Sequence, residues 1–352
     1  MALKFPTSLV GKRDSSYTPP FETSVYDVND SLIESRTNAG IGGFYNRDDI
    51  YRLDIGSSCT AIGSTAFRYC DNVGTNNEEL YIPDSVITIG SYAFQRNYSW
   101  FDKKLRLSNN LTTIGSFAFQ GCRFGGDLVI PDSVTTMPSS CFDGFRFTTI
   151  QIGSGITSIP GSCFRSNTLL TELNIPNTVT SIGSNAFRGL TNCTGDCIIP
   201  DSVGGALNGW NDSGFTGDIR IGNGVTAIGG SCFTRTQNAS GTLTIGNSVT
   251  YIGSYAFRYC YKLTGDLILP SSITSIGSWV WGRCNNLNNV YVNSPASVFT
   301  SSNAFTQYPQ NRTLYVTSAY LSGYDSTWRT AQRWTASGQT VAEWTSYPDP
   351  MP

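Results

Sequence analysis

The sequence predicts a repeat solenoid of about twelve coils that share one continuous hydrophobic core. First, the motif LNIPNTVTSIGSNAF at 173–187 recurs in variants that begin at Leu80, Leu128, Leu243 and Leu267. Second, successive repeats are 22 to 27 residues apart, a period typical of stacked repeat proteins. Third, each coil carries more large apolar side chains than it can bury alone, whereas stacked coils bury them against one another.

The first half of the motif predicts a short strand. Leu173 and Ile175 lie two positions apart, which places both side chains on one face of the strand. A proline such as Pro176 then ends the strand, and Asn-Thr or Asp-Ser supplies turn chemistry. The first apolar residues of the twelve expected strands are Leu53, Leu80, Leu105, Leu128, Ile150, Leu173, Cys197, Ile219, Leu243, Leu267, Val290 and Leu314.

The second half of the motif predicts an inward-facing leg and a column of aromatic rings. Val179 and Ile182 face inward, and we interpret the glycine that follows in most coils as a permissive residue where the chain turns a corner. In the degenerate repeat at 201–215, Trp210 is expected to replace the phenylalanine. The other members of the expected column are Phe67, Phe94, Phe119, Phe142, Phe164, Phe187, Phe233, Phe257, Trp281 and Phe305.

The solenoid is expected at residues 51–316, with a segment of different composition on each side. Residues 1–50, in which 25–36 is a candidate short helix, form either a cover for the first coil or an arm that docks on another protein. Residues 317–352 are expected to cap the open hydrophobic end with aromatic side chains on a short helix, followed by a PDPMP tail. These aromatic residues are Tyr320, Tyr324, Trp328, Trp334 and Trp344.

The composition and the first residues limit which classes of partner and which folding compartment are expected. With 14% charged residues and a net charge of −2, the chain gives no reason to expect nucleic acid or an anionic membrane as its main partner. No apolar run reaches the length of about 18 residues that would indicate membrane insertion. The first residues lack the apolar core of a signal peptide, which favours folding in a cytosol.

The ten cysteines follow the repeat rather than a disulfide framework. Cys141, Cys163 and Cys232 directly precede the column phenylalanine, where other coils have alanine. A residue that replaces alanine at an inward position acts as a small buried hydrophobe, so free thiols are favoured over disulfides. Because the chain has no histidine and no CxxC pair, no metal or other cofactor is expected.

No catalytic residues are expected. Without histidine the chain has no Ser-His or Cys-His dyad, and it has no GxxxxGKS phosphate loop. Four aspartates recur at one repeat position before the strand, so hydrogen bonding in turns is favoured over the paired acids of a hydrolase. They are Asp127, Asp196, Asp218 and Asp266.

Two surfaces are candidates for binding. Arg68, Arg165, Arg188 and Arg258 directly follow the column aromatic residue and define what we call the arginine rim. The rim is either a solvated edge whose side-chain stems cover the core, or a cationic stripe for acidic polysaccharide or for carboxylates of a neighbouring subunit.

The second surface, the strand face, consists of the outward residues of the expected strands. Tyrosines beside Arg, Asn and Gln suit sugar rings, whereas Val129, Ile198 and Ile268 on the same line suit coverage by another chain. Both interpretations stay open. The candidate binding residues are Tyr81, Arg106, Gln151, Asn174, Arg220, Tyr291 and Tyr315.

The repeat LYIPDSVITIGSYAF at 80–94 resembles the BspA-like leucine-rich repeats, also called the Treponema pallidum type, and the resemblance extends from about residue 53 to 316. The closing LYVTSAYLSGYDSTW at 314–328 is similar to the usual last repeat of that family. The resemblance implies a right-handed leucine-rich-repeat β-solenoid with a parallel sheet on one side. It also implies adhesion or binding at cell surfaces, with relatives in large viruses and bacteriophages.

Together with the cytosolic start and the free thiols, the resemblance favours a non-enzymatic virion structural or fibre protein. The opening MALKFPTS is also similar to the starts of some phage fibre proteins. The expected partners are other virion proteins or copies of the chain, with host-surface polysaccharide or protein as a further possibility. The alternative is a secreted or cell-surface microbial adhesin, outside the virion.

Overall fold

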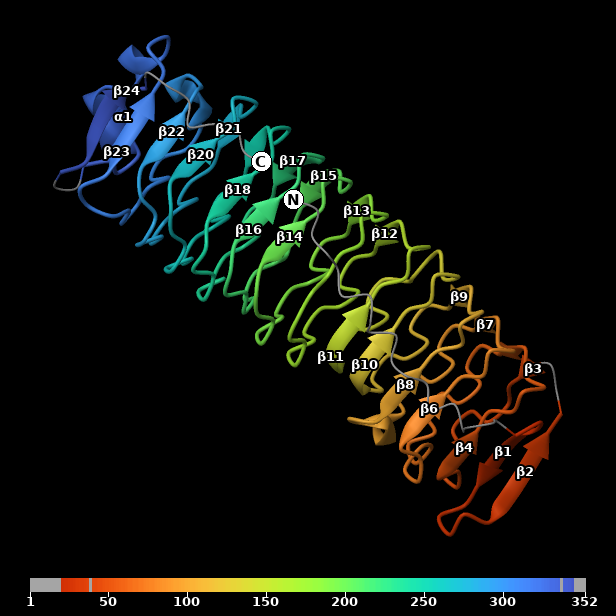
Figure 1. Cartoon of the computed structure of the whole chain (residues 1–352). Coiled ribbons are helices and arrows are strands. Elements are labelled where there is room, and N and C mark those ends of the chain that lie inside the picture. The colour runs from red at the N-terminus through yellow and green to blue at the C-terminus, as the bar shows by residue number, and fades with distance from the viewer. Residues whose placement is uncertain (1–19, 38–39, 336–337, 345–352) are drawn as a thin grey trace.

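The computed structural model describes residues 20–37, 40–335 and 338–344. Figure 1 shows an elongated solenoid in which short strands run in two lines along opposite sides of the stacked coils. The coils are about 13 in number, and buried apolar side chains fill their common interior. The predicted repeat solenoid is therefore confirmed.

The first line of strands, the first ladder, contains the strands that the motif predicts. They are parallel, as in Leu80 opposite Leu105, and each buries its two apolar residues. Residues 173–175 carry the motif without forming a regular strand, although Ile175 is buried. The strands are β4 (Arg52–Asp54), β6 (Glu79–Tyr81), β8 (Lys104–Arg106), β10 (Gly125–Val129), β11 (Arg146–Gln151), β14 (Cys197–Ile199), β16 (Ile219–Ile221), β18 (Leu243–Ile245), β20 (Leu267–Leu269), β22 (Val290–Val292) and β23 (Thr313–Val316).

The second legs form a second ladder, in addition to the expected sheet on one side. Ile62, Ile89 and Ile114 pair in register on successive coils, so each isoleucine packs on its equivalent in the next coil. All of these strands are short, with two to four residues each. They are β3 (Gly40–Ile41), β5 (Ala61–Ile62), β7 (Thr88–Ile89), β9 (Thr113–Ile114), β12 (Ser158–Ile159), β13 (Ser181–Ile182), β15 (Gly205–Leu207), β17 (Val225–Ile228), β19 (Tyr251–Ile252) and β21 (Ser275–Ile276).

The predicted aromatic column runs through the core. Neighbouring rings lie 4.7 to 6.3 Å apart between centroids, and most are stacked nearly parallel. Trp210 lies between Phe187 and Phe233, which confirms that it replaces the phenylalanine of its coil. The column begins one coil earlier than predicted, because Phe44 stacks on Phe67 at 5.1 Å.

The repeated glycine has a different role from the one expected at a corner. A Cβ atom on Gly90 would lie 2.4 Å from the backbone nitrogen of Ser64, and one on Gly115 would lie 2.3 Å from that of Ser91. Neither glycine has the positive φ that would require its conformational freedom. The interpretation as a permissive corner residue is therefore wrong: glycine is needed because the backbone of the preceding coil passes where a side chain would begin.

All ten cysteines are buried free thiols, as the repeat pattern predicts. Where cysteine lies three residues after the column aromatic, its thiol donates to the carbonyl oxygen of the preceding coil's aromatic residue. Cys122 Sγ lies 3.0 Å from the oxygen of Phe94, and Cys284 Sγ lies 3.1 Å from that of Phe257. Burial raises the pKa of these thiols, so they are protonated and act as hydrogen-bond donors.

Residues 23–36 of the N-terminal segment form a β-hairpin, so the candidate helix at 25–36 is wrong. β1 (Thr23–Tyr26) pairs antiparallel with both β2 (Leu32–Arg36) and β4. The Asp27 carboxylate accepts hydrogen bonds from the backbone N–H groups of Asn29 and Ser31, at 2.8 and 2.9 Å, and this turn chemistry closes the hairpin. The hairpin lies against the first coil, and residues 1–19 of the proposed docking arm lie outside the described residues.

At the other end, β24 (Thr340–Glu343) adds a parallel strand to β23, and a short helix, α1 (Ser326–Ala331), covers the core. Asp325 caps α1 by accepting from the backbone N–H of Trp328 at 2.9 Å. Trp328 packs edge-on against Phe299, and Trp334 against Phe305, both at 5.1 Å. The described chain also contains three single-turn 3-10 helices: Tyr98–Trp100, Ala296–Val298 and Leu321–Gly323.

The expected PDPMP tail lies outside the described residues. Among the residues that the structure describes, no helix combines the length and the hydropathy that crossing a membrane requires.

Candidate binding surfaces

The strand face lies on the outer side of the first ladder. Because its strands are parallel and in register, outward residues of successive coils form a line: Tyr81 is opposite Arg106, and Tyr291 is opposite Tyr315. Gln151, Asn174 and Arg220 are exposed, and the other four predicted residues are half-buried. The structure therefore aligns the seven predicted residues along one face rather than gathering them into one site.

The two arginines of the strand face are already paired. Arg106 lies 3.6 Å from the Glu79 carboxylate, and Arg220 lies 2.9 Å from that of Asp218. The hydrogen bond to Asp218 raises the pKa of Arg220. Asp218 also accepts from the backbone N–H of Thr242 at 2.7 Å, and this bond together with the one from Arg220 lowers the pKa of its carboxyl. This face therefore has little net positive charge to offer an anion.

The most distinct feature of the strand face is an aromatic pair near its C-terminal end. The rings of Tyr291 and Tyr315 stack with their centroids 4.8 Å apart and an angle of 13° between their planes. Trp344 packs edge-on against Tyr291 at 5.3 Å and so supports the pair from the side. Burial, reinforced by the nearby Asp266 carboxylate, raises the pKa of the Tyr291 hydroxyl, which keeps it a hydrogen-bond donor at neutral pH.

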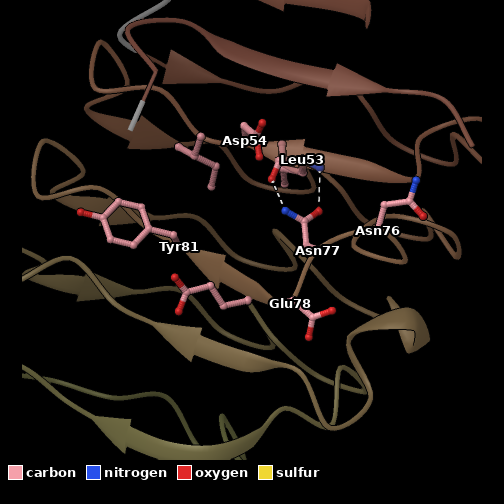
Figure 2. Close-up of a pocket in the computed structure, with 8 residues that line it drawn as sticks. Leu53, Asp54, Asn76, Asn77, Glu78 and Tyr81 are labelled. Atoms are coloured by element: carbon pink, nitrogen blue, oxygen red, sulfur yellow. Dashed lines mark hydrogen bonds between the residues drawn. The ribbon is translucent and has the colours of Figure 1, made fainter. Parts of the chain in front are cut away.

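A shallow hollow of about 190 Å³ interrupts the strand face between β4 and β6. Figure 2 shows the side chain of Asn77 pointing to the backbone of Leu53. Its amide accepts from the Leu53 N–H at 2.9 Å and donates to the Leu53 oxygen at 3.0 Å, so it replaces a neighbouring strand. Asp54 at its edge is paired with Arg52. The hollow thus follows from a break in the ladder, and its polar groups already have partners.

The four residues of the arginine rim have different surroundings. Arg165 donates two hydrogen bonds to Asp143, at 3.0 and 2.5 Å, and this carboxylate raises its pKa. Arg188 is exposed, and its side chain makes no ion pair or hydrogen bond within the described ranges. Arg68 lies over the rings of Tyr69 and Tyr92, at 4.7 and 4.8 Å, and its Nε donates to Gln95 at 2.6 Å.

Arg258, the fourth member of the rim, lies among three aromatic rings. Its guanidinium carbon is 5.3, 4.4 and 4.8 Å from the ring centroids of Tyr255, Tyr259 and Trp279. The sequence analysis identified the arginine without its aromatic neighbours. A signal was present, because Tyr255 and Trp279 stand two residues before the column aromatic, where most coils have a small or polar residue.

The repeated aspartates serve the turns, as expected. Asp196 accepts from the backbone N–H of Asp218 at 2.8 Å, and Asp266 accepts from that of Asn289 at 3.1 Å. Asp127 accepts from the hydroxyl of Thr149 at 2.6 Å. Each carboxylate thus joins one coil to the next. Across residues 20–37, 40–335 and 338–344, no group of three or more His, Cys, Asp or Glu side chains is arranged to hold a metal ion.

Comparison with known proteins finds several similar solved structures. Among solved structures, the chain is similar to a leucine-rich repeat protein from Bacteroides ovatus, with 18% identity, a TM-score of 0.49, and coverage of 93% of this chain and 91% of that one. The chain is also similar to the pneumococcal vaccine antigen PcpA, with 15% identity and a TM-score of 0.49, and the match covers 94% of this chain and 83% of that one. A third similar structure is a leucine-rich cell surface protein from Faecalibacterium prausnitzii, with 17% identity and a TM-score of 0.42, and the match covers 92% of this chain and 97% of that one.

No curated protein matches the sequence significantly. The family model of the BspA type leucine-rich repeat region (6 copies) matches residues 29–99, 97–205 and 211–322. Because these matches span well over half of the sequence and follow the observed coils, the chain belongs to the BspA-type leucine-rich repeat family.

Proposed function

We propose that this protein is a non-enzymatic binding protein whose strand face contacts a partner on a biological surface. The stacked pair of Tyr291 and Tyr315 carries the proposal, because it keeps two aromatic rings half-exposed outside the core. An aromatic face packs on the C–H groups of a sugar ring, while the hydroxyl binds a sugar hydroxyl. A glycan is therefore the partner that best suits this part of the face.

We place the protein first in a virion, as a structural or fibre component that contacts the host surface or a neighbouring subunit. The ten buried free thiols support this assignment, because thiols persist in a protein that folds in a reducing cytosol, where virions are assembled. The alternative is a secreted or cell-surface adhesin, which the resemblance to the BspA-like repeats favours. Both assignments use the same strand face.

The aromatic pair is tested with Tyr291→Ala/Tyr315→Ala in the full chain. We expect binding to immobilised neutral oligosaccharides of hexose and N-acetylhexosamine to fall by about tenfold or more, because stacking and hydroxyl contacts are lost together. The matched control is Tyr251→Ala, which removes an exposed tyrosine from the second ladder. Equal binding by the double variant and the control would reject the strand-face site.

The compartment is tested separately with an antibody against the solenoid. Label on purified virus particles, with none on intact cells that carry the gene, is the result expected for a virion protein. Label on the cell surface, in the absence of particles, would instead establish the adhesin.

A further inference from the structure

We infer that the part of the arginine rim around Arg258 binds the carboxylate of an acidic sugar, as in a polysaccharide of uronic acids. This site goes beyond the proposed function, because it lies after the second ladder and not on the strand face. Three observations support it: the unpaired donors of Arg258, the aromatic rings around it and the absence of a carboxylate partner in the described chain.

Arg258 has hydrogen-bond donors without protein acceptors. Its Nε is buried and has no partner, and no hydrogen bond or ion pair engages the rest of its guanidinium within the described residues. Two equivalent arginines differ, because Arg165 is paired with Asp143 and Arg68 donates to Gln95. Arg188 is also unpaired in the described chain, but no aromatic ring lies beside its guanidinium there. Because a ligand cannot reach the buried Nε, the donors left for it are the two Nη groups, which are suited to bind a carboxylate through two parallel hydrogen bonds.

Two of the rings around Arg258 stand at a repeat position that most other coils fill with a small polar residue. Tyr255 and Trp279 have φ angles of 64° and 57°, in the left-handed region that bulky residues rarely occupy. The equivalent positions in other coils share this backbone conformation and mostly carry small polar residues such as Ser162, Asn185 and Ser231. Tyr92 and Phe117 are the other aromatic residues at this position, and they stack on each other at 5.4 Å. Tyr255 is 38% exposed, so its ring is not required to fill the core.

The neighbouring coil makes the site more cationic. Arg283, two residues after Trp281, lies 5.5 Å from the centroid of Tyr259 and donates to Gln307 rather than to a carboxylate. Two positive charges therefore share the same aromatic surface with no acidic residue in ion-pair contact among the described residues. Such a surface combines the charge that attracts a carboxylate with the ring faces on which a pyranose packs.

These features favour a uronic acid over an acidic peptide. An acidic side chain would use the guanidinium alone, whereas a pyranose carboxylate brings a ring with C–H faces to the adjoining aromatic surface. An extended polymer of such sugars would also bring its next residues toward Arg283 on the neighbouring coil.

The test measures binding of the full chain to polygalacturonate, alginate and hyaluronate by calorimetry. The wild type is expected to bind at least one of these polymers, and Arg258→Gln is expected to weaken that binding by about tenfold or more. Arg258→Lys, which keeps the charge but not the fork, should lose a similar amount if the two hydrogen bonds matter. Trp279→Ala should also weaken binding, because a ring face is lost.

Arg188→Gln is the matched control, because Arg188 occupies the same rim position without aromatic neighbours. The Arg188→Gln protein should bind the polymer as tightly as the wild type. Methyl esterification of the carboxylates should abolish binding. The inference is overturned if the wild type binds none of the three polymers, if Arg188→Gln loses as much affinity as Arg258→Gln, or if the methyl ester binds equally well. Tighter binding of poly-glutamate than of every uronate would overturn it in favour of an acidic protein.

Discussion

Replacing Gly90 with alanine tests whether the spacing of the coils dictates the glycine column. The added Cβ would lie 2.4 Å from the nitrogen of Ser64 and 2.7 Å from the carbonyl carbon of Gly63. Normal contacts between non-bonded heavy atoms are about 3.5 Å or more, so the two coils would have to separate locally by about 1 Å. The atoms in the way belong to the backbone and cannot rotate aside.

That separation would break several inter-coil contacts at once. The Gly90 N–H donates to the oxygen of Ile62 at 2.7 Å, and the Phe67 N–H donates to that of Ala93 at 2.7 Å. The rings of Phe67 and Phe94 stack 5.3 Å apart between centroids. Losing two hydrogen bonds at about 1 kcal/mol each, with about 1–3 kcal/mol for overpacking, predicts a loss of about 3–5 kcal/mol in the free energy of unfolding.

Equilibrium unfolding in guanidinium chloride, followed by the fluorescence of buried tryptophans such as Trp100, measures this loss. Amide hydrogen exchange adds a local measurement, because the amides that join these two coils should lose protection first. Gly42→Ala is the matched control: no atom lies within 4 Å of its added Cβ, so its stability should stay within about 1 kcal/mol of the wild type. An equally small effect of Gly90→Ala would refute the steric explanation.

Two further predictions concern the thiols and the N-terminal hairpin. Burial raises the pKa of the Cys260 thiol from 9.0 to about 12. Above pH 9 the unfolded chain therefore loses thiol protons that the folded chain keeps. The free energy of unfolding should fall by about 1 kcal/mol per thiol at pH 10. Cys232→Ala, which introduces the residue found at Ala186 and Ala256, should reduce that alkaline loss in denaturant titrations, and an unchanged pH dependence would contradict the linkage. Deleting residues 1–50 should destabilise the first coils, because it removes Phe44 from the aromatic column and β1 from β4; unchanged hydrogen exchange at Phe67 would contradict this.

The repetition of the sequence made the interior predictable. Alternation assigns Leu173 and Ile175 to the same side in every repeat, and the fixed distance to Phe187 places one ring per coil at an equivalent point. The exchange of Cys232 with Ala186 likewise indicated an inward position. These features follow from local periodicity, which a single sequence with many repeats displays many times.

Features that depend on the distance between coils were not predictable in this way. A two-residue strand such as Thr88–Ile89 carries no alternation of its own, so the second ladder was missed. The steric role of Gly90 becomes visible only when Ser64 is placed beside it. At the N-terminus, the stretch around Phe44 departs from the later repeats in the spacing between its glycines and the ring, which concealed an additional coil.

The candidate surfaces were predicted only in part. Register placed Tyr291 beside Tyr315 on the outside of the first ladder. The pairing of Arg220 with Asp218 was not foreseen, although residues two apart on a strand share a face. The rings around Arg258 come from two coils, so their meeting depends on how the coils stack.

Reactivity of the cysteines tests most directly whether successive coils enclose one interior in a constant register. The ten thiols lie between residues 59 and 284 and sample most of the solenoid. Alkylation at neutral pH, read for each cysteine by mass spectrometry, should leave all ten unmodified in the native protein. All ten should react in guanidinium chloride without reductant. Rapid native modification at several positions, or a disulfide-linked pair that resists alkylation after unfolding, would contradict the shared interior of free thiols.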